Sequence, residues 1–223
     1  MQELGQAGRL VVGLDRSAQA LRFCRLRQQR RLCRSDAVAL PFKDGKFDLV
    51  TALDVCEHLN DDAAGLREIA RVTRPGGWVI LTVPAFAFLW SDHDRVLWHK
   101  RRYTLSQLTA RVTGAGLSVA RISYFNLPIF PAACVFRFAK RIWKRRGPPT
   151  SDFLAVPPLL NSLLTRLLAL ETSALKRLNL PLGLSLVCVA RKADHLVWLP
   201  MNAQPTAAIF ARSRIPAEAS PSG

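Results

Sequence analysis

The sequence has few cysteines, and their spacing gives no pattern that would pair them. The five are scattered through 223 residues, and no two form a CxxC pair: Cys24, Cys33, Cys56, Cys134 and Cys188. An odd number with this spacing argues against a disulfide framework and against a zinc site built from cysteines. We therefore expect no metal site, and we expect a reducing compartment, the cytoplasm.

Long hydrophobic runs are also missing. The opening decapeptide MQELGQAGRL has no apolar segment of the kind found in signal peptides, and no apolar run reaches the roughly 18 residues of a membrane span. These absences predict a cytoplasmic protein that is soluble or lies peripherally on a membrane surface.

Acidic residues are scarce. The chain has 16 Asp and Glu against 32 Lys and Arg, which gives a net charge of +16. Such an excess predicts attraction to a polyanion, either nucleic acid or an anionic membrane. The alternative is that arginines simply fill solvated faces, as expected for a helix face across residues 22–34.

The stretch FDLVTALDVCEHL, from Phe47 to Leu59, has the clearest strand pattern in the chain. It is apolar up to Leu53 and then turns polar at Asp54, Glu57 and His58. A buried parallel strand has this pattern, with a polar crevice at its carboxyl end, where open α/β sheets bind ligands.

Alternating strand and helix patterns surround this stretch. Strands are predicted at 9–14, 78–83, 117–125 and 183–190. Helices are predicted after Ser17, after Asp61 or Asp62, and after Thr104, where Gln107 completes a capping box. The alternation predicts an α/β fold with parallel strands.

The ordered motifs SDAVALPFKDGKFD (35–48), EHL (57–59) and REIARVTRPGGWVILTVP (67–84) resemble the class I S-adenosylmethionine-dependent methyltransferases. The pattern is most similar to bacterial small-molecule and lipid methyltransferases. The resemblance implies a Rossmann-like sheet and S-adenosyl-L-methionine as the cofactor.

The resemblance also implies cofactor-binding positions. Asp15 matches the acid that accepts hydrogen bonds from the ribose hydroxyls, and its alternative is a helix-capping aspartate. Asp36 and Ala37 match the adenine-reading turn, and their alternative is a plain Asx turn. Leu53 and Asp54, where the central strand ends, complete the implied set.

The segment from Pro84 to Thr104 is long and polar for a connector, and it leaves the carboxyl end of a strand. His93 and His99 are therefore candidate catalytic bases, with a structural role as the alternative for each. The other candidate substrate contacts in the segment are Asp92, Asp94, Arg101, Arg102 and Tyr103.

An insertion at 126–181, before the last predicted strand, contains two apolar-striped helical segments, and the first of them is basic. It predicts either a lid over an acceptor pocket or peripheral contact with an anionic membrane. Together these patterns predict a methyltransferase domain over 1–193 and a disordered tail over 194–223.

The first strand and the glycine-rich loop of the resembled family should precede Arg9, and neither is visible there. We therefore expect an N-terminally truncated sheet, in which the strands at 9–14 and 47–53 pair directly or leave open edges, and weak cofactor binding.

The predicted function is methyl transfer to a small, hydrophobic or lipid-linked acceptor. The alternative is a non-catalytic remnant or a membrane-surface binding module. Nucleic acid is not an expected substrate, because the residues after the central strand read Leu53-Asp54-Val55-Cys56 and lack the D/N-PP-Y/F motif of enzymes that methylate base amino groups.

Overall fold

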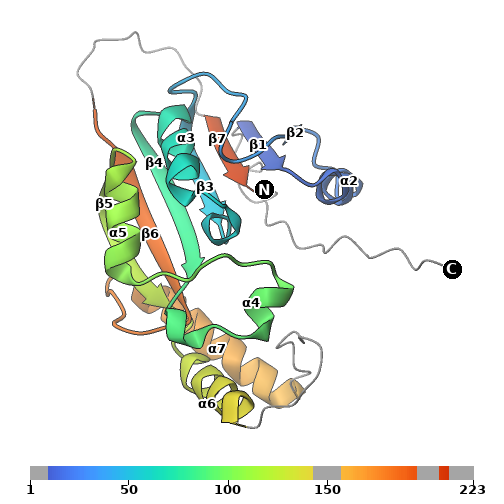
Figure 1. Cartoon of the computed structure of the whole chain (residues 1–223), viewed down its shortest axis with the longest axis vertical. Coiled ribbons are helices and arrows are strands. Elements are labelled where there is room, and N and C mark those ends of the chain that lie inside the picture. Colours follow the sequence, from blue (N-terminus) through green and yellow to red (C-terminus); the bar gives the residue numbers. More distant parts are fainter. Residues whose placement is uncertain (1–9, 143–156, 195–205, 211–223) are drawn as a thin grey trace, which may run out of the picture.

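The computed structural model describes residues 10–142, 157–194 and 206–210, which form one mixed sheet flanked by helices (Figure 1). The strand order is β2-β1-β7-β3-β4-β6-β5, and β6 runs antiparallel to both of its neighbours. The strands are β1 (Leu10–Asp15), β2 (Leu32–Arg34), β3 (Phe47–Leu53), β4 (Thr73–Pro84), β5 (Leu117–Phe125), β6 (Ser185–Lys192) and β7 (Thr206–Phe210).

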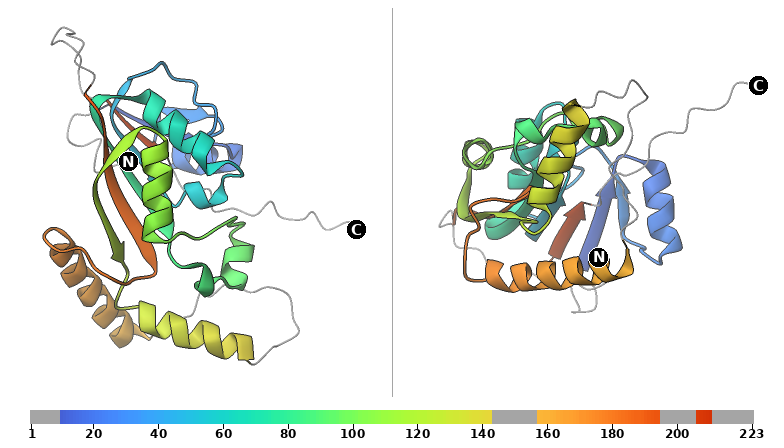
Figure 2. Two further views of the ribbon diagram at one scale, coloured as in Figure 1. Left: turned by 60° about the vertical axis from the view of Figure 1, so that its left-hand side comes forward. Right: turned by 90° about the horizontal axis from the view of Figure 1, so that it is seen from below.

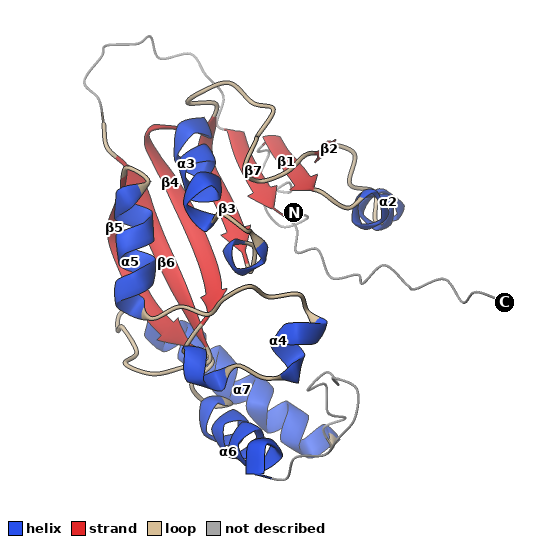
Figure 3. Ribbon diagram, in the orientation of Figure 1, coloured by secondary structure: helices blue, strands red, loops and turns tan. Residues whose placement is uncertain are grey.

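Two helices cover one face of the sheet, and further helical segments lie at its edges and its lower end (Figure 3). The helix α3 (Asp62–Val72) packs on β4, and α5 (Leu105–Gly114) packs on β5. The remaining segments are α2 (Ala18–Leu26), η1 (Cys56–His58), η2 (Ala87–Leu89), α4 (Asp92–Val96), α6 (Phe130–Ile142) and α7 (Pro158–Leu175).

The core forms where α3 and α5 meet the sheet. Leu66 and Ile69 of α3 and Leu108 of α5 are fully buried, together with Val50 of β3 and Leu81 of β4. The helices begin where their caps predict. Asp61 accepts a hydrogen bond from the Ala64 amide, and Thr104 with Gln107 forms the predicted capping box.

The segment 22–34 differs from its prediction as one solvated helical face. The helix α2 ends at Leu26, and β2 begins at Leu32 and pairs in parallel with β1. Arg27 caps the end of α2 and Gln28 has a positive φ of 60°, so the chain turns there and returns to the sheet edge.

The main correction concerns the C-terminal segment, which we predicted to be disordered over 194–223. Thr206–Phe210 is a strand between β1 and β3, and it pairs in parallel with both. The rest of that prediction lies largely outside the described residues. The sheet is therefore closed at its centre, and the expected direct β1–β3 pairing or open edge is wrong. Backbone groups facing an empty central slot would lack partners, and β7 supplies them.

The insertion forms two helices, α6 and α7, beyond the carboxyl ends of β4 and β5 (Figure 2). The buried carboxylate of Glu171 in α7 accepts the backbone amides of Asn126 and Leu127, which fixes the start of the insertion. Arg121 of β5 donates to Asn179 and to the carbonyls of two neighbouring residues, so both ends of the insertion are anchored.

Among the helices of the described ranges, none has the length and apolarity that a bilayer crossing requires.

A proline at the centre of β7 tests the closed sheet. Replacing Ala208 by proline removes an amide from a strand that is paired on both sides, so we expect loss of cooperative unfolding or a melting temperature lower by about 10 °C. Ala208→Val is the matched control, because valine keeps the amide and favours strands. Equal thermal unfolding curves for the two variants, measured by circular dichroism, would show that β7 does not hold the sheet together.

Candidate functional site

A cavity opens at the carboxyl ends of the parallel strands β1, β2 and β3. Its lining comes from three segments, one at the carboxyl end of each strand: Leu14, Asp15, Arg16, Ser35, Asp36, Ala37, Asp54, Val55, His58 and Leu59. Parallel strands present their carboxyl ends at one edge, so residues far apart in sequence converge there. Of the predicted cofactor positions, Asp15, Asp36, Ala37 and Asp54 line the cavity.

Asp15 is the buried acid of the cavity, with 4% of its surface exposed at the end of β1. One carboxylate oxygen, Oδ1, accepts a hydrogen bond from the Ser17 amide at 2.7 Å. The other, Oδ2, is buried and has no hydrogen-bond partner within the described part of the chain. Burial raises the pKa of Asp15, opposed by the Ser17 and Arg16 amides and the Arg16 charge. The uncompensated oxygen suits a ligand hydroxyl group.

Asp36 and Ala37 lie in the turn that follows β2. The Asp36 carboxylate accepts the Val38 amide at 3.2 Å, so the Asx turn that was the alternative to adenine recognition is present. The other carboxylate oxygen lies 3.9 Å from Arg16 Nη1. Both residues line the cavity, so the turn that the hydrogen bond stabilises also presents them to a ligand.

Asp54 has an unusual backbone conformation, with φ at +52°. Its amide donates to the carbonyl and to the hydroxyl oxygen of Thr82 in β4, both at 3.0 Å. The Thr82 hydroxyl in turn donates to the Asp54 carboxylate at 3.1 Å. Such backbone strain in a non-glycine residue is held by its surroundings and is common at ligand sites. Leu53, the preceding residue, does not line the cavity.

The segment after β4 is organised by the carboxylate of Asp94, which is fully buried. Arg102 Nε donates to it at 2.8 Å and Arg102 Nη2 at 3.1 Å, while His99 Nδ1 lies 2.9 Å away. The Ser91 amide donates as well, at 2.8 Å. Burial alone would raise the pKa of Asp94, but the hydrogen bonds and the Arg102 charge outweigh it and hold that pKa well below its usual range.

The same segment is tied to α3 through Asp62. Tyr103 donates its hydroxyl to Asp62 at 2.9 Å, and Arg101 contacts the same carboxylate at 2.7 Å and the carbonyls of Leu59 and Asn60. Burial raises the pKa of the Tyr103 phenol. Asp94, Arg101, Arg102 and Tyr103 therefore hold the segment in place, and their contact with a substrate stays a prediction.

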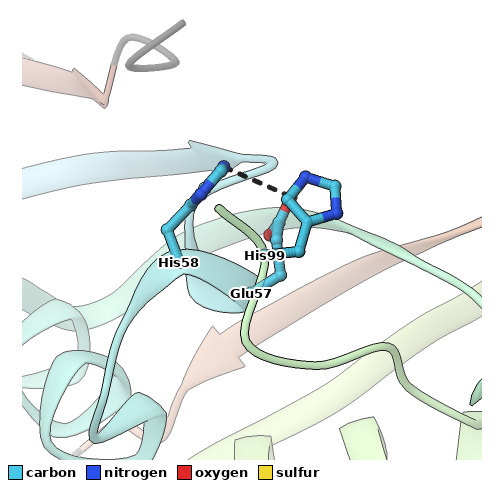
Figure 4. A group of neighbouring side chains, drawn as sticks. All are labelled: Glu57, His58 and His99. Carbon is cyan, nitrogen blue, oxygen red and sulfur yellow. Dashed lines mark ion pairs between the residues drawn. The ribbon is translucent and has the colours of Figure 1, made fainter. Parts of the chain in front are cut away.

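The structure brings together three side chains that were not grouped from the sequence. Glu57 and His58 of η1 and His99 of the segment after α4 converge beside the cavity (Figure 4). His58 lines the cavity, whereas the predicted bases His93 and His99 do not. His58 was part of the EHL motif, and that motif was the available signal for it.

Part of the chain is similar in sequence to known proteins. A model of the methyltransferase domain matches residues 1–81. A demethylmenaquinone methyltransferase of Corynebacterium kroppenstedtii is 38% identical over 97 residues, and a ubiquinone biosynthesis O-methyltransferase of Bordetella pertussis is 30% identical over 87 residues. These matches cover 41% and 36% of this chain and 42% and 36% of those proteins, so the alignment spans about two fifths of their length.

Solved structures extend the likeness to most of the chain. An S-adenosylmethionine-dependent methyltransferase from Methanosarcina mazei has a TM-score of 0.54 at 14% identity, covering 87% of each chain. One from Mesorhizobium loti has a TM-score of 0.52 at 15% identity, covering 82% of this chain and 80% of that one.

Residues 1–81 of this chain match the methyltransferase domain, and most of the chain shares the fold of the solved S-adenosylmethionine-dependent methyltransferases. The Rossmann-like fold predicted for it is confirmed, and the cofactor of the family is S-adenosyl-L-methionine. The residues of the cavity fit that cofactor, because Asp15 lines it and the buried Oδ2 of Asp15, which has no hydrogen-bond partner among the described residues, can accept a hydrogen bond from a ribose hydroxyl.

Asp15→Asn should separate ligand binding from stability. The folded-state pKa of Asp15 is raised, so the ionised carboxylate opposes folding above that pKa, and a neutral amide should keep or raise the melting temperature at pH 7. Loss of the charged acceptor should weaken binding of S-adenosylhomocysteine by about 10- to 100-fold in calorimetric titration.

The control is Asp194→Asn, which removes an exposed carboxylate paired with Arg191 outside the cavity. Asp15→Asn binding S-adenosylhomocysteine as tightly as the unaltered chain would exclude Asp15 as the ribose acceptor.

Proposed function

We propose that this methyltransferase binds S-adenosyl-L-methionine in the β1–β3 cavity and transfers its methyl group to a small hydrophobic acceptor. The main support for this proposal is the buried carboxylate oxygen of Asp15, in a cavity that Asp36 and Asp54 also line. Asp15 would hold the ribose, and the turn at Asp36 and Ala37 would contact the adenine. When bound, the cofactor supplies a methyl group for in-line displacement from a sulfonium.

The chain contributes alignment and exclusion of water to such a displacement. Three hydrogen bonds tie Asp54 to Thr82 at the end of β3. They keep Asp54 at the edge of the cavity, where it can contact the cofactor. The buried Asp94 network keeps the segment after β4 against η1. A phenol acceptor needs little help from a base, whereas an alcohol needs one.

The acceptor class is inferred from the relatives and from the insertion. The two relatives carry names that refer to menaquinone and ubiquinone biosynthesis. In this chain, large apolar side chains are exposed along both insertion helices, among them Val135, Phe138, Ile142, Leu159, Leu163 and Leu170. An acceptor with a quinone-like ring and an apolar or lipid-linked chain suits both observations.

The insertion also supports a peripheral membrane location, at the cytoplasmic face. The cavity lining contains no residue of α6 or α7, so of the two predicted roles, lid and membrane contact, the cavity gives the lid role no support. In α6, Val135 is 70% exposed and Ile142 is 80% exposed, in a chain of net charge +16. An apolar helix face on a strongly basic protein is suited to an anionic bilayer surface.

Methyl transfer is tested directly with labelled S-adenosyl-L-methionine and demethylmenaquinone in detergent. We expect product with the unaltered chain and a loss of at least tenfold in Asp15→Asn at subsaturating cofactor, because the variant binds cofactor more weakly. Cofactor binding without transfer to demethylmenaquinone or a demethylubiquinone precursor would exclude quinone acceptors. Absence of both binding and transfer would favour the non-catalytic binding module.

Membrane contact is tested by co-sedimentation with vesicles that contain anionic phospholipid. Replacing Val135 and Ile142 together by aspartate should lower the vesicle-bound fraction at least tenfold, since it places charge on the face that would enter the bilayer. Leu26→Asp, at a site in α2 that is 72% exposed, is the matched control and should bind normally. If the unaltered chain, the double variant and Leu26→Asp all bind vesicles equally, the α6 face is not the membrane contact.

A further inference from the structure

Three side chains with metal-ligating atoms converge beside the cofactor cavity. The Nε2 atoms of His58 and His99 each lie 4.0 Å from Glu57 Oε1, and the ligand atoms of all three residues lie within 4.8 Å of one another. The Glu57 side chain is fully buried, and that of His99 is 3% exposed.

The hydrogen bond from Asp94 decides which nitrogen of His99 faces Glu57. Asp94 is held ionised by Arg102, so it accepts the proton on His99 Nδ1 at 2.9 Å. In the neutral imidazole, Nε2 then carries the lone pair, and this atom lies 4.0 Å from Glu57 Oε1. His99 Nε2 is buried and has no hydrogen-bond partner among the residues described. Two electron-pair donors 4.0 Å apart are suited to ligate one cation.

Hydrogen bonds from neighbouring residues position these side chains before any ion binds. A metal-bound histidine usually donates its second ring nitrogen to a carboxylate, and Asp94 is placed to accept from His99. The Lys100 amide donates to the Glu57 carbonyl at 2.7 Å, and Arg101 donates to the carbonyls of Leu59 and Asn60. The segment that carries His99 is thereby fixed directly to the segment that carries Glu57 and His58.

We propose that Glu57, His58 and His99 bind a divalent transition-metal ion of the zinc class. Two imidazoles and one carboxylate are a common ligand set for zinc, with bonds of about 2.0–2.2 Å. Ligand atoms around a tetrahedral ion of that size lie about 3.4 Å apart, so the observed separations of 4.0 Å and up to 4.8 Å must shorten by about 0.6 to 1.4 Å when an ion binds. This site departs from the metal-free protein predicted from the cysteines.

The site adjoins the cavity through His58, which belongs to both. Three protein ligands leave a fourth position for an exogenous oxygen. A bound cation lowers the pKa of an oxygen ligand, so a hydroxyl acceptor there would ionise without a free histidine base. This role rests on the proposed methyl transfer, whereas metal binding itself does not.

The competing explanation is that His99 carries protons on both nitrogens and forms ion pairs with Asp94 and Glu57. That arrangement needs no metal, and it makes the opposite prediction for metal titration. Glu57→Gln distinguishes the two, because glutamine keeps the shape of the side chain and removes the charge.

The experiment is calorimetric titration of Zn²⁺ into the full chain after treatment with chelator, with Mg²⁺ as a second probe. We expect one equivalent of Zn²⁺ to bind and Mg²⁺ to bind at least 100-fold more weakly, because imidazole ligands favour zinc. Glu57→Gln and His99→Gln should each lower zinc affinity at least 100-fold. Asp94→Asn should lower it about 10- to 100-fold. His93→Ala, on the same segment but outside the cluster, should bind as the unaltered chain does.

Cobalt substitution identifies the ligand atoms. Ligation by nitrogen and oxygen gives weak visible bands, whereas thiolate ligation by a cysteine adds strong near-ultraviolet absorption. Any one of three results would overturn the site: zinc fails to bind stoichiometrically, the cobalt form shows thiolate absorption, or Glu57→Gln and His99→Gln bind zinc as tightly as the unaltered chain. Titration of S-adenosylhomocysteine into the same samples checks the fold and keeps the two proposals apart, since either ligand can bind without the other.

Discussion

The filled central slot of the sheet is the constraint on which the rest of the structure depends. β1 and β3 both pair with β7, so they stand two strand spacings apart, about 10 Å. Asp15 ends β1 and Asp54 follows β3, and the cavity opens between these two ends. Direct pairing of β1 with β3 would halve that separation and close the space. The strand from the far end of the sequence therefore sets the width of the site.

A second constraint acts at the same edge, through buried charge. Asp94, Arg102 and His99 lie in a segment that would otherwise be an irregular connection, and their mutual hydrogen bonds satisfy charges that burial would penalise. Asp62 does the same for Arg101 and Tyr103. Polar residues that look like substrate contacts in the sequence thus stabilise the segment that brings His99 to η1. In the structure their hydrogen bonds position the segment, while the cavity is lined by residues of shorter motifs.

Elements whose formation depends on neighbouring residues in the sequence were predicted from the sequence. The strand at 117–125, the caps at Asp61 and Thr104, and the polar turn at Asp54 follow from periodicity and capping, and the structure has them. Asp15 and Asp54 were found where predicted strands end, whereas Asp36 was found through the motif that resembles the adenine-reading turn of the family. β2 and β7 were missed because each is short and its stability comes from pairing with strands distant in sequence. Thr206–Phe210 lies in a segment rich in alanine and proline, where pattern gives little warning.

The grouping of Glu57, His58 and His99 escaped prediction for a related reason. Sequence signatures of metal sites rest on ligands at short, regular spacing, and here one ligand comes from a separate segment of the chain. What brings it in is the tie between Lys100 and the Glu57 carbonyl, together with the orientation that Asp94 imposes on the imidazole. A carboxylate and two imidazoles brought together in this way form a ligand set that counting cysteines does not detect. The positions of the charges, which become visible after folding, indicate that a cation belongs there.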